Sequence, residues 1–153
     1  MEKKVFDLLN KVVATQGVFY TRLHQFHWYV SGTRFFTLHE KFEELYDQVT
    51  ADMDEVAERL LAIGGQPYAT LTEFIEHSVI KESTSDQALS QDQMVEAIVN
   101  DYRTLIALYD EGIHLTDEAE DFPSNDMLIA LKSEAEKTIW MLNAYLDKSA
   151  NEK

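Results

Sequence analysis

Residues 39–58, HEKFEELYDQVTADMDEVAE, place two pairs of potential metal ligands on one predicted helix. His39 and Glu43 are four positions apart at one end of this stretch, and Asp54 and Glu58 are four positions apart at the other. Side chains four positions apart in a helix are neighbours on one face. Each pair therefore predicts half of a metal site, and the helix between the pairs holds the two halves apart.

Apolar residues recur every three or four positions through most of the chain, which is the period of an α-helix. The sequence predicts long helices over residues 4–31, 35–63, 91–115 and 124–147, and a short one over 70–78. Gly64 and Pro67 end the second helix, Ser90 and Gln93 form a capping box, and Ser124 caps the last helix. Four long helices with one long connection predict an all-α, ferritin-like four-helix bundle, in one domain over residues 1–153.

The composition is that of a globular protein with an acidic surface. The 153 residues are 45% hydrophobic, and the formal net charge is −15. Such a surface attracts cations and repels nucleic acid. No apolar run reaches the length of a bilayer crossing, and residues 1–10 lack the apolar core of a signal peptide. We therefore expect a cytoplasmic protein without membrane contact, and the absence of Cys excludes disulfides and thiolate metal sites.

The two ligand pairs share a flank of the helix but not a height along it. The four side chains fall within an arc of about 100°, whereas the fifteen residues from His39 to Asp54 span roughly 22 Å. Either the pairs are unrelated surface charges, or a second copy of the chain packs antiparallel against this flank. The second hypothesis joins the unlike ends of two helices and predicts two identical sites in each dimer.

The first helix offers further ligands, because His24 and His27 are one turn apart. The resulting mixture of imidazoles and two or three carboxylates suits iron, and also manganese or zinc. Plainer interpretations are a structural role for His24, packing or an interface for Trp28, and ordinary surface contacts for the charged pairs. The tyrosines, Tyr20 included, are interpreted as packing residues.

Three segments closely resemble the signature of the Dps family, the mini-ferritins also called DNA-binding proteins from starved cells. They are residues 27–32 (HWYVSG), 36–43 (FTLHEKFE) and 54–59 (DEVAER). The resemblance extends over the whole bundle, including the short helix in the middle connection and residues 125–129 (NDMLI). It is greatest to the branch found in Gram-positive bacteria.

The resemblance implies a dodecameric cage with ferroxidase sites at its dimer interfaces. Such a protein oxidises Fe(II) with hydrogen peroxide or dioxygen, stores the ferric mineral inside the cage and protects against oxidative damage. One chain would supply His27, His39 and Glu43, and its partner would supply Asp54 and Glu58. Trp28 would lie near the site and take up stray oxidising equivalents. Many members have Asp where this chain has Glu43, and the longer side chain moves the carboxylate.

An acidic break is predicted over residues 117–123, before the last helix. The plain interpretation is a solvated loop. In a ferritin-like cage, carboxylates at this place line three-fold pores and draw cations inward. The resemblance therefore makes Asp117, Asp121 and Asp126 candidate pore residues.

Three other functions compete with this one. A di-iron site within one bundle needs two Glu-x-x-His motifs, and only Glu111–His114 provides one. A DNA-coating, nucleoid-associated stress protein is suggested by the family name, but the terminal lysines are sparse against an acidic body, so we predict weak or no DNA binding. These lysines are Lys3, Lys4, Lys148 and Lys153. A purely structural oligomer would assemble without accelerating iron oxidation.

Overall fold

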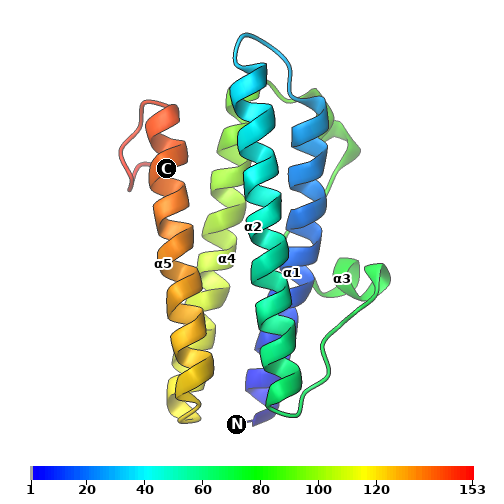
Figure 1. Ribbon diagram of the computed structural model, residues 1–153, viewed down its shortest axis with the longest axis vertical. Helices are drawn as coiled ribbons and strands as arrows, with labels where there is room; N and C mark the ends of the chain where they lie inside the picture. The colour runs from blue at the N-terminus through cyan, green and yellow to red at the C-terminus, as the bar shows by residue number, and fades with distance from the viewer. Residues whose placement is uncertain (1) are drawn as a thin grey trace.

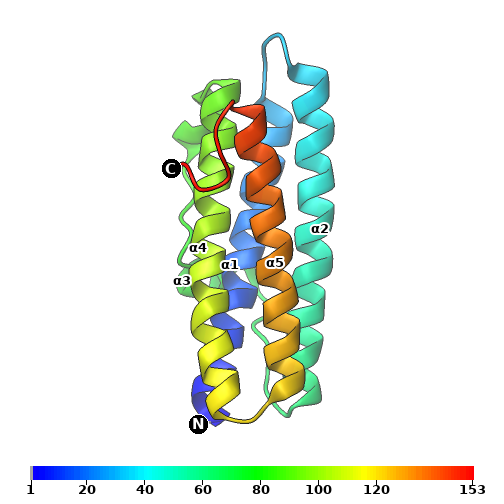
Figure 2. The same ribbon diagram turned by 90° about the vertical axis from the view of Figure 1, so that its left-hand side faces the viewer.

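The amphipathic stretches form four long helices in a computed structural model that describes residues 2–153 (Figure 1). These helices are α1 (Glu2–Tyr29), α2 (Phe35–Ala62), α4 (Gln91–Glu118) and α5 (Phe122–Tyr145). The short helix α3 (Leu71–His77) and the 3-10 helix η1 (Thr84–Ala88) lie in the connection between α2 and α4. Helix α1 packs against α2, α4 packs against α5, and α1 also contacts α4, which gives the predicted bundle (Figure 2).

Local signals in the sequence explain where the helices begin and end. The Ser90 side chain accepts a hydrogen bond from the backbone N–H of Gln93, whose side chain accepts one from the backbone N–H of Ser90. This confirms the predicted capping box at the start of α4. Gly64 follows α2 with a φ of 95°, a left-handed conformation that glycine adopts without steric cost. The 3-10 helix η1 was not predicted.

The turn between α4 and α5 is tighter than the predicted acidic break. Helix α4 continues to Glu118 and α5 begins at Phe122, so most of the break is helical. The capping residue is Asp121, whose carboxylate accepts a hydrogen bond from the backbone N–H of Ser124 at 3.2 Å. The prediction that Ser124 caps α5 was wrong, because an earlier residue with a side-chain acceptor takes that position.

The interior is built from aromatic and branched side chains. Phe19, Phe26 and Phe42 are fully buried, and the Phe19 ring packs edge-on against Tyr102 with centroids 4.9 Å apart. Helix α3 lies against α1 at Gly17, where a Cβ atom would come within 2.6 Å of the Phe74 ring. A glycine at this position thus allows the middle connection to lie close to the bundle.

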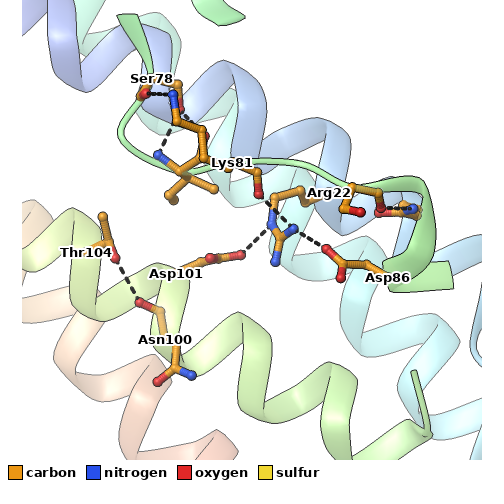
Figure 3. Close-up of polar contacts among 10 residues, drawn as sticks. Arg22, Ser78, Lys81, Asp86, Asn100, Asp101 and Thr104 are labelled. Carbon is orange, nitrogen blue, oxygen red and sulfur yellow. Dashed lines mark hydrogen bonds and ion pairs between the residues drawn. The ribbon is translucent and has the colours of Figure 1, made fainter. Parts of the chain in front are cut away.

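Arg22 ties the middle connection to the bundle (Figure 3). Its Nε donates a hydrogen bond to Asp101 on α4 at 2.8 Å, and its Nη1 donates to Asp86 in η1 at 2.6 Å. Nη1 also donates to the backbone oxygen of Lys81 at 3.0 Å. The side chains of Arg22 and Asp101 are only 7% and 13% exposed. Buried charges persist where they are paired, so these contacts hold the connection in place.

Replacement of Arg22 by Met should lower the free energy of unfolding by about 3–5 kcal/mol, because Asp101 would be left buried without its partner. Denaturant unfolding followed by circular dichroism, at matched protein concentrations, measures this change. Lys3→Met is the control, because Lys3 pairs with Asp7 on an exposed surface and should give no measurable loss. Equal losses in the two variants would contradict the role given to Arg22.

Candidate metal centre

His27 and His39 form a stacked pair where the end of α1 meets the start of α2. Their ring centroids are 3.7 Å apart and their planes are inclined by 13°. His27 Nδ1 is 2.6 Å from the backbone oxygen of His39, and His39 Nδ1 is 2.7 Å from the backbone oxygen of His27. A carbonyl oxygen only accepts hydrogen bonds, so each Nδ1 carries a proton and donates it. In the neutral form of each ring, Nε2 then has the lone pair that can bind a metal ion.

Glu43 adds an oxygen donor beside this pair. Its Oε1 is 3.8 Å from His27 Nε2, and its side chain is 55% exposed. The carboxylate faces the nitrogen that the backbone contacts leave free, at a distance too long for a strong hydrogen bond. Over residues 2–153, no group of three His, Asp or Glu side chains is arranged to hold a metal ion. These three residues therefore form a partial site.

The other two predicted ligands lie toward the opposite end of α2. This helix is continuous from Phe35 to Ala62, so Asp54 lies roughly 22 Å along the axis from His39. The side chains of Asp54 and Glu58 are both exposed. The structure thus brings His27, His39 and Glu43 together and keeps Asp54 and Glu58 away from them within one chain.

Aromatic side chains surround the histidine pair. His24 stacks on Tyr46 with centroids 3.8 Å apart, and both of its ring nitrogens are buried without a hydrogen-bond partner among the described residues. Burial, followed by the neighbouring His27, lowers the pKa of His24 and favours the neutral ring. His24 is therefore packed behind the site, and the ring that meets His27 is that of His39.

Tyr46 packs beside the histidine pair, a position that the sequence interpretation did not assign to it. Its ring lies edge-on to His27 at a centroid distance of 5.4 Å. Burial and then the charge of Glu43 raise the pKa of Tyr46, which keeps the phenol neutral. Tyr46 follows His39 by seven residues, close to two helical turns, and this spacing was the available sign of a shared flank. The backbone carbonyl groups that accept hydrogen bonds from the two Nδ1 atoms could not be recognised from residue types.

Trp28 lies at the edge of this cluster and faces outward. Its side chain is 68% exposed, and its ring centroid is 5.2 Å from that of His24. An indole this exposed at the edge of a partial site is available to contact another molecule.

The three candidate pore carboxylates are in different surroundings. Asp117 and Asp126 are exposed, whereas Asp121 accepts a hydrogen bond from Arg59 Nη2 at 2.8 Å. Burial disfavours the charge of Asp121, but hydrogen bonds from Ser124 and Arg59 outweigh it and lower the pKa. Asp121 therefore has a structural function at the α4–α5 turn.

Comparison with known proteins places this fold in the ferritin-like class. The family model described as "Ferritin-like domain" matches residues 6–151. The "DNA protection during starvation protein 2" of Bacillus anthracis is 45% identical over 148 residues, which are 97% of this chain and 100% of the relative.

Two solved structures of Dps from Listeria innocua, one soaked with zinc and one soaked with cobalt, are each 46% identical to this chain. The zinc-soaked structure has a TM-score of 0.93 and the alignment covers 97% of this chain and 99% of the other. The cobalt-soaked structure has a TM-score of 0.94, with 97% and 95% covered. The chain belongs to the Dps family. No helix among residues 2–153 combines the length and apolar character that a bilayer crossing requires.

Replacement of His39 by Ala should weaken binding of Co(II) by at least about tenfold. The change removes one Nε2 donor and the ring that stacks on His27 and donates to its carbonyl oxygen. Visible absorption during a Co(II) titration measures the affinity. His114→Ala is the control, because His114 is exposed on α4, away from the pair. Equal affinity in the His39 variant and the unsubstituted protein would show that the stacked pair does not bind metal.

Proposed function

We propose that the protein is a ferroxidase that oxidises Fe(II) at sites shared between two copies of the chain and stores the ferric product. The observation that carries this proposal is the stacked histidine pair, which presents two free Nε2 atoms beside Glu43. In an antiparallel dimer, the ligands missing there are supplied by Asp54 and Glu58 of the other copy.

The flank that carries both half-sites also has the surface of an interface. Trp28, Phe36 and Leu61 are 68%, 85% and 59% exposed. A mainly apolar groove of about 460 Å³ lies beside Asp54 and is bordered by Ala57 and Phe74. Exposed apolar side chains of this extent favour burial against another protein surface, which supports pairing along α2.

The donor set favours oxidation of iron. Neutral imidazoles bind Fe(II) without adding negative charge, and three carboxylates stabilise the more highly charged Fe(III) more strongly. A higher affinity for the product than for the substrate lowers the reduction potential of the bound iron. Zinc and manganese suit the same ligands and would compete with iron.

The proposed reaction with hydrogen peroxide is a paired electron transfer. Two Fe(II) each lose one electron, and one peroxide accepts both as its O–O bond breaks. With two water molecules the products are two FeOOH units and four protons, so atoms and charge balance. Delivery of both electrons together avoids release of hydroxyl radical, and Trp28 at the edge of the site would take up an oxidising equivalent that escapes. Dioxygen is the alternative oxidant.

We further propose that the dimers assemble into a dodecameric cage in the cytoplasm that holds the mineral. The formal charge of −15 per chain would concentrate Fe(II) at its surface, and the exposed Asp117 and Asp126 would contribute to cation entry. The same charge opposes DNA binding, because affinity for DNA depends on Lys and Arg contacts to phosphate. Iron storage is therefore favoured over DNA coating, although the relatives' names refer to DNA protection.

Anaerobic loading with Fe(II) followed by peroxide should consume two Fe(II) for each peroxide in a particle of cage size. The Asp54→Asn, Glu58→Gln double variant should oxidise iron at least about tenfold more slowly, because the partner's carboxylates are lost. Stopped-flow absorbance measures the rate, and Asp92→Asn on exposed α4 surface is the matched control. Oxidation no faster than in free solution, in the unsubstituted protein, would favour a purely structural oligomer.

A further inference from the structure

A small chamber with a mixed polar and apolar lining lies between the four long helices, apart from the histidine pair. Its volume is about 10 Å³, which is room for one water-sized particle. All four long helices contribute to its lining, through Gln16 of α1, Asp52 of α2, Tyr102 and Tyr109 of α4, and Glu134 of α5. Polar groups from four separate helices therefore meet at one small position, alongside apolar side chains of α2, α4 and α5.

Gln16 has a buried oxygen that needs a positive partner. The residue is 1% exposed, and its Nε2 donates a hydrogen bond to the Tyr109 hydroxyl at 3.2 Å. Its Oε1 has no hydrogen-bond partner among the described residues and belongs to the chamber lining. A buried carbonyl oxygen without a partner is costly, so the fold is more stable with a donor or a cation beside it.

The chamber also has an excess of negative charge. Asp52 and Glu134 both line it, and Gln48 donates a hydrogen bond to Asp52 Oδ1 at 2.8 Å. Among the described residues that form the lining, none is Lys, Arg or His. Glu134 is exposed to solvent, whereas Asp52 is half-buried. A water molecule would satisfy the Gln16 oxygen but would leave the Asp52 carboxylate without a counter-charge in the chamber. A divalent cation satisfies the amide oxygen and balances both charges.

We propose that this chamber binds one divalent cation of the Mn(II), Mg(II) or Fe(II) class. The ligands are the Oε1 atom of Gln16 and the carboxylates of Asp52 and Glu134. The phenol groups in the lining add oxygen donors, the type that such hard cations prefer. The volume admits a single ion and excludes a two-metal centre, whose ions lie about 3.5–4 Å apart. The site is independent of the proposed ferroxidase site, because one bundle contains all of its ligands.

A crystal of the full chain soaked in Mn(II) tests this assignment directly. The expected result is an anomalous peak in the chamber of every chain, within bonding distance of Gln16 Oε1. Density typical of water without an anomalous signal would overturn the proposal. The peak at the dimer interface is judged separately, so a chamber peak without an interface peak counts against the ferroxidase site and supports this one.

Titration of Mn(II) followed by electron paramagnetic resonance provides a second test. A background of His39→Ala with Asp54→Asn removes the interface site, and added Gln16→Leu should then weaken the remaining binding by at least about tenfold. Gln16→Leu removes the unpaired amide oxygen and also the hydrogen bond to Tyr109, so circular dichroism is used to confirm that the variant folds. Gln25→Leu is the control on the same helix, outside the chamber. Unchanged Mn(II) affinity in the Gln16 variant would overturn the proposal.

Discussion

The rise of an α-helix, about 1.5 Å per residue, is the constraint on which the proposed site depends. Helix α2 is continuous over 28 residues, so His39 near its start and Asp54 near its end cannot approach one another in one chain. This separation excludes a shared ion within the monomer. Two antiparallel copies of the helix would place the His39 end of one beside the Asp54 end of the other. In the proposed site, a rigid helix thus makes iron chemistry depend on assembly.

The rest of the fold supports this helix at its two ends. At the start of α2, the reciprocal contacts between His27 and His39 connect the side chains and backbones of two helices, so packing of α1 against α2 also fixes both tautomers. Near the end of α2, Arg59 donates hydrogen bonds to Asp121 and Ser124 and connects α2 to the start of α5. Ligands held by packed helices keep their geometry when the metal changes its charge.

Periodicity and capping residues were sufficient to predict four long helices, the short α3 and the crossover, because these features depend on local sequence. The tight α4–α5 turn was missed because Asp121 and Ser124 are both good caps, and tertiary contacts with Arg59 favour the earlier one. At the site, residue types and spacing indicated His27, His39 and Glu43. The mutual carbonyl contacts could not be predicted, because they depend on how closely two backbones approach. The chamber at Gln16 was not predicted either, because it requires residues from four helices.

Mixing two inactive variants tests the shared site most directly. Copies with His39→Ala retain Asp54 and Glu58, and copies with Asp54→Asn retain both histidines. If the chains reassort at random, half of the dimers are mixed and each has one intact site, so mixing should restore about a quarter of the original rate of iron oxidation. No recovery in particles shown by native mass spectrometry to contain both variants would contradict a site shared between two chains.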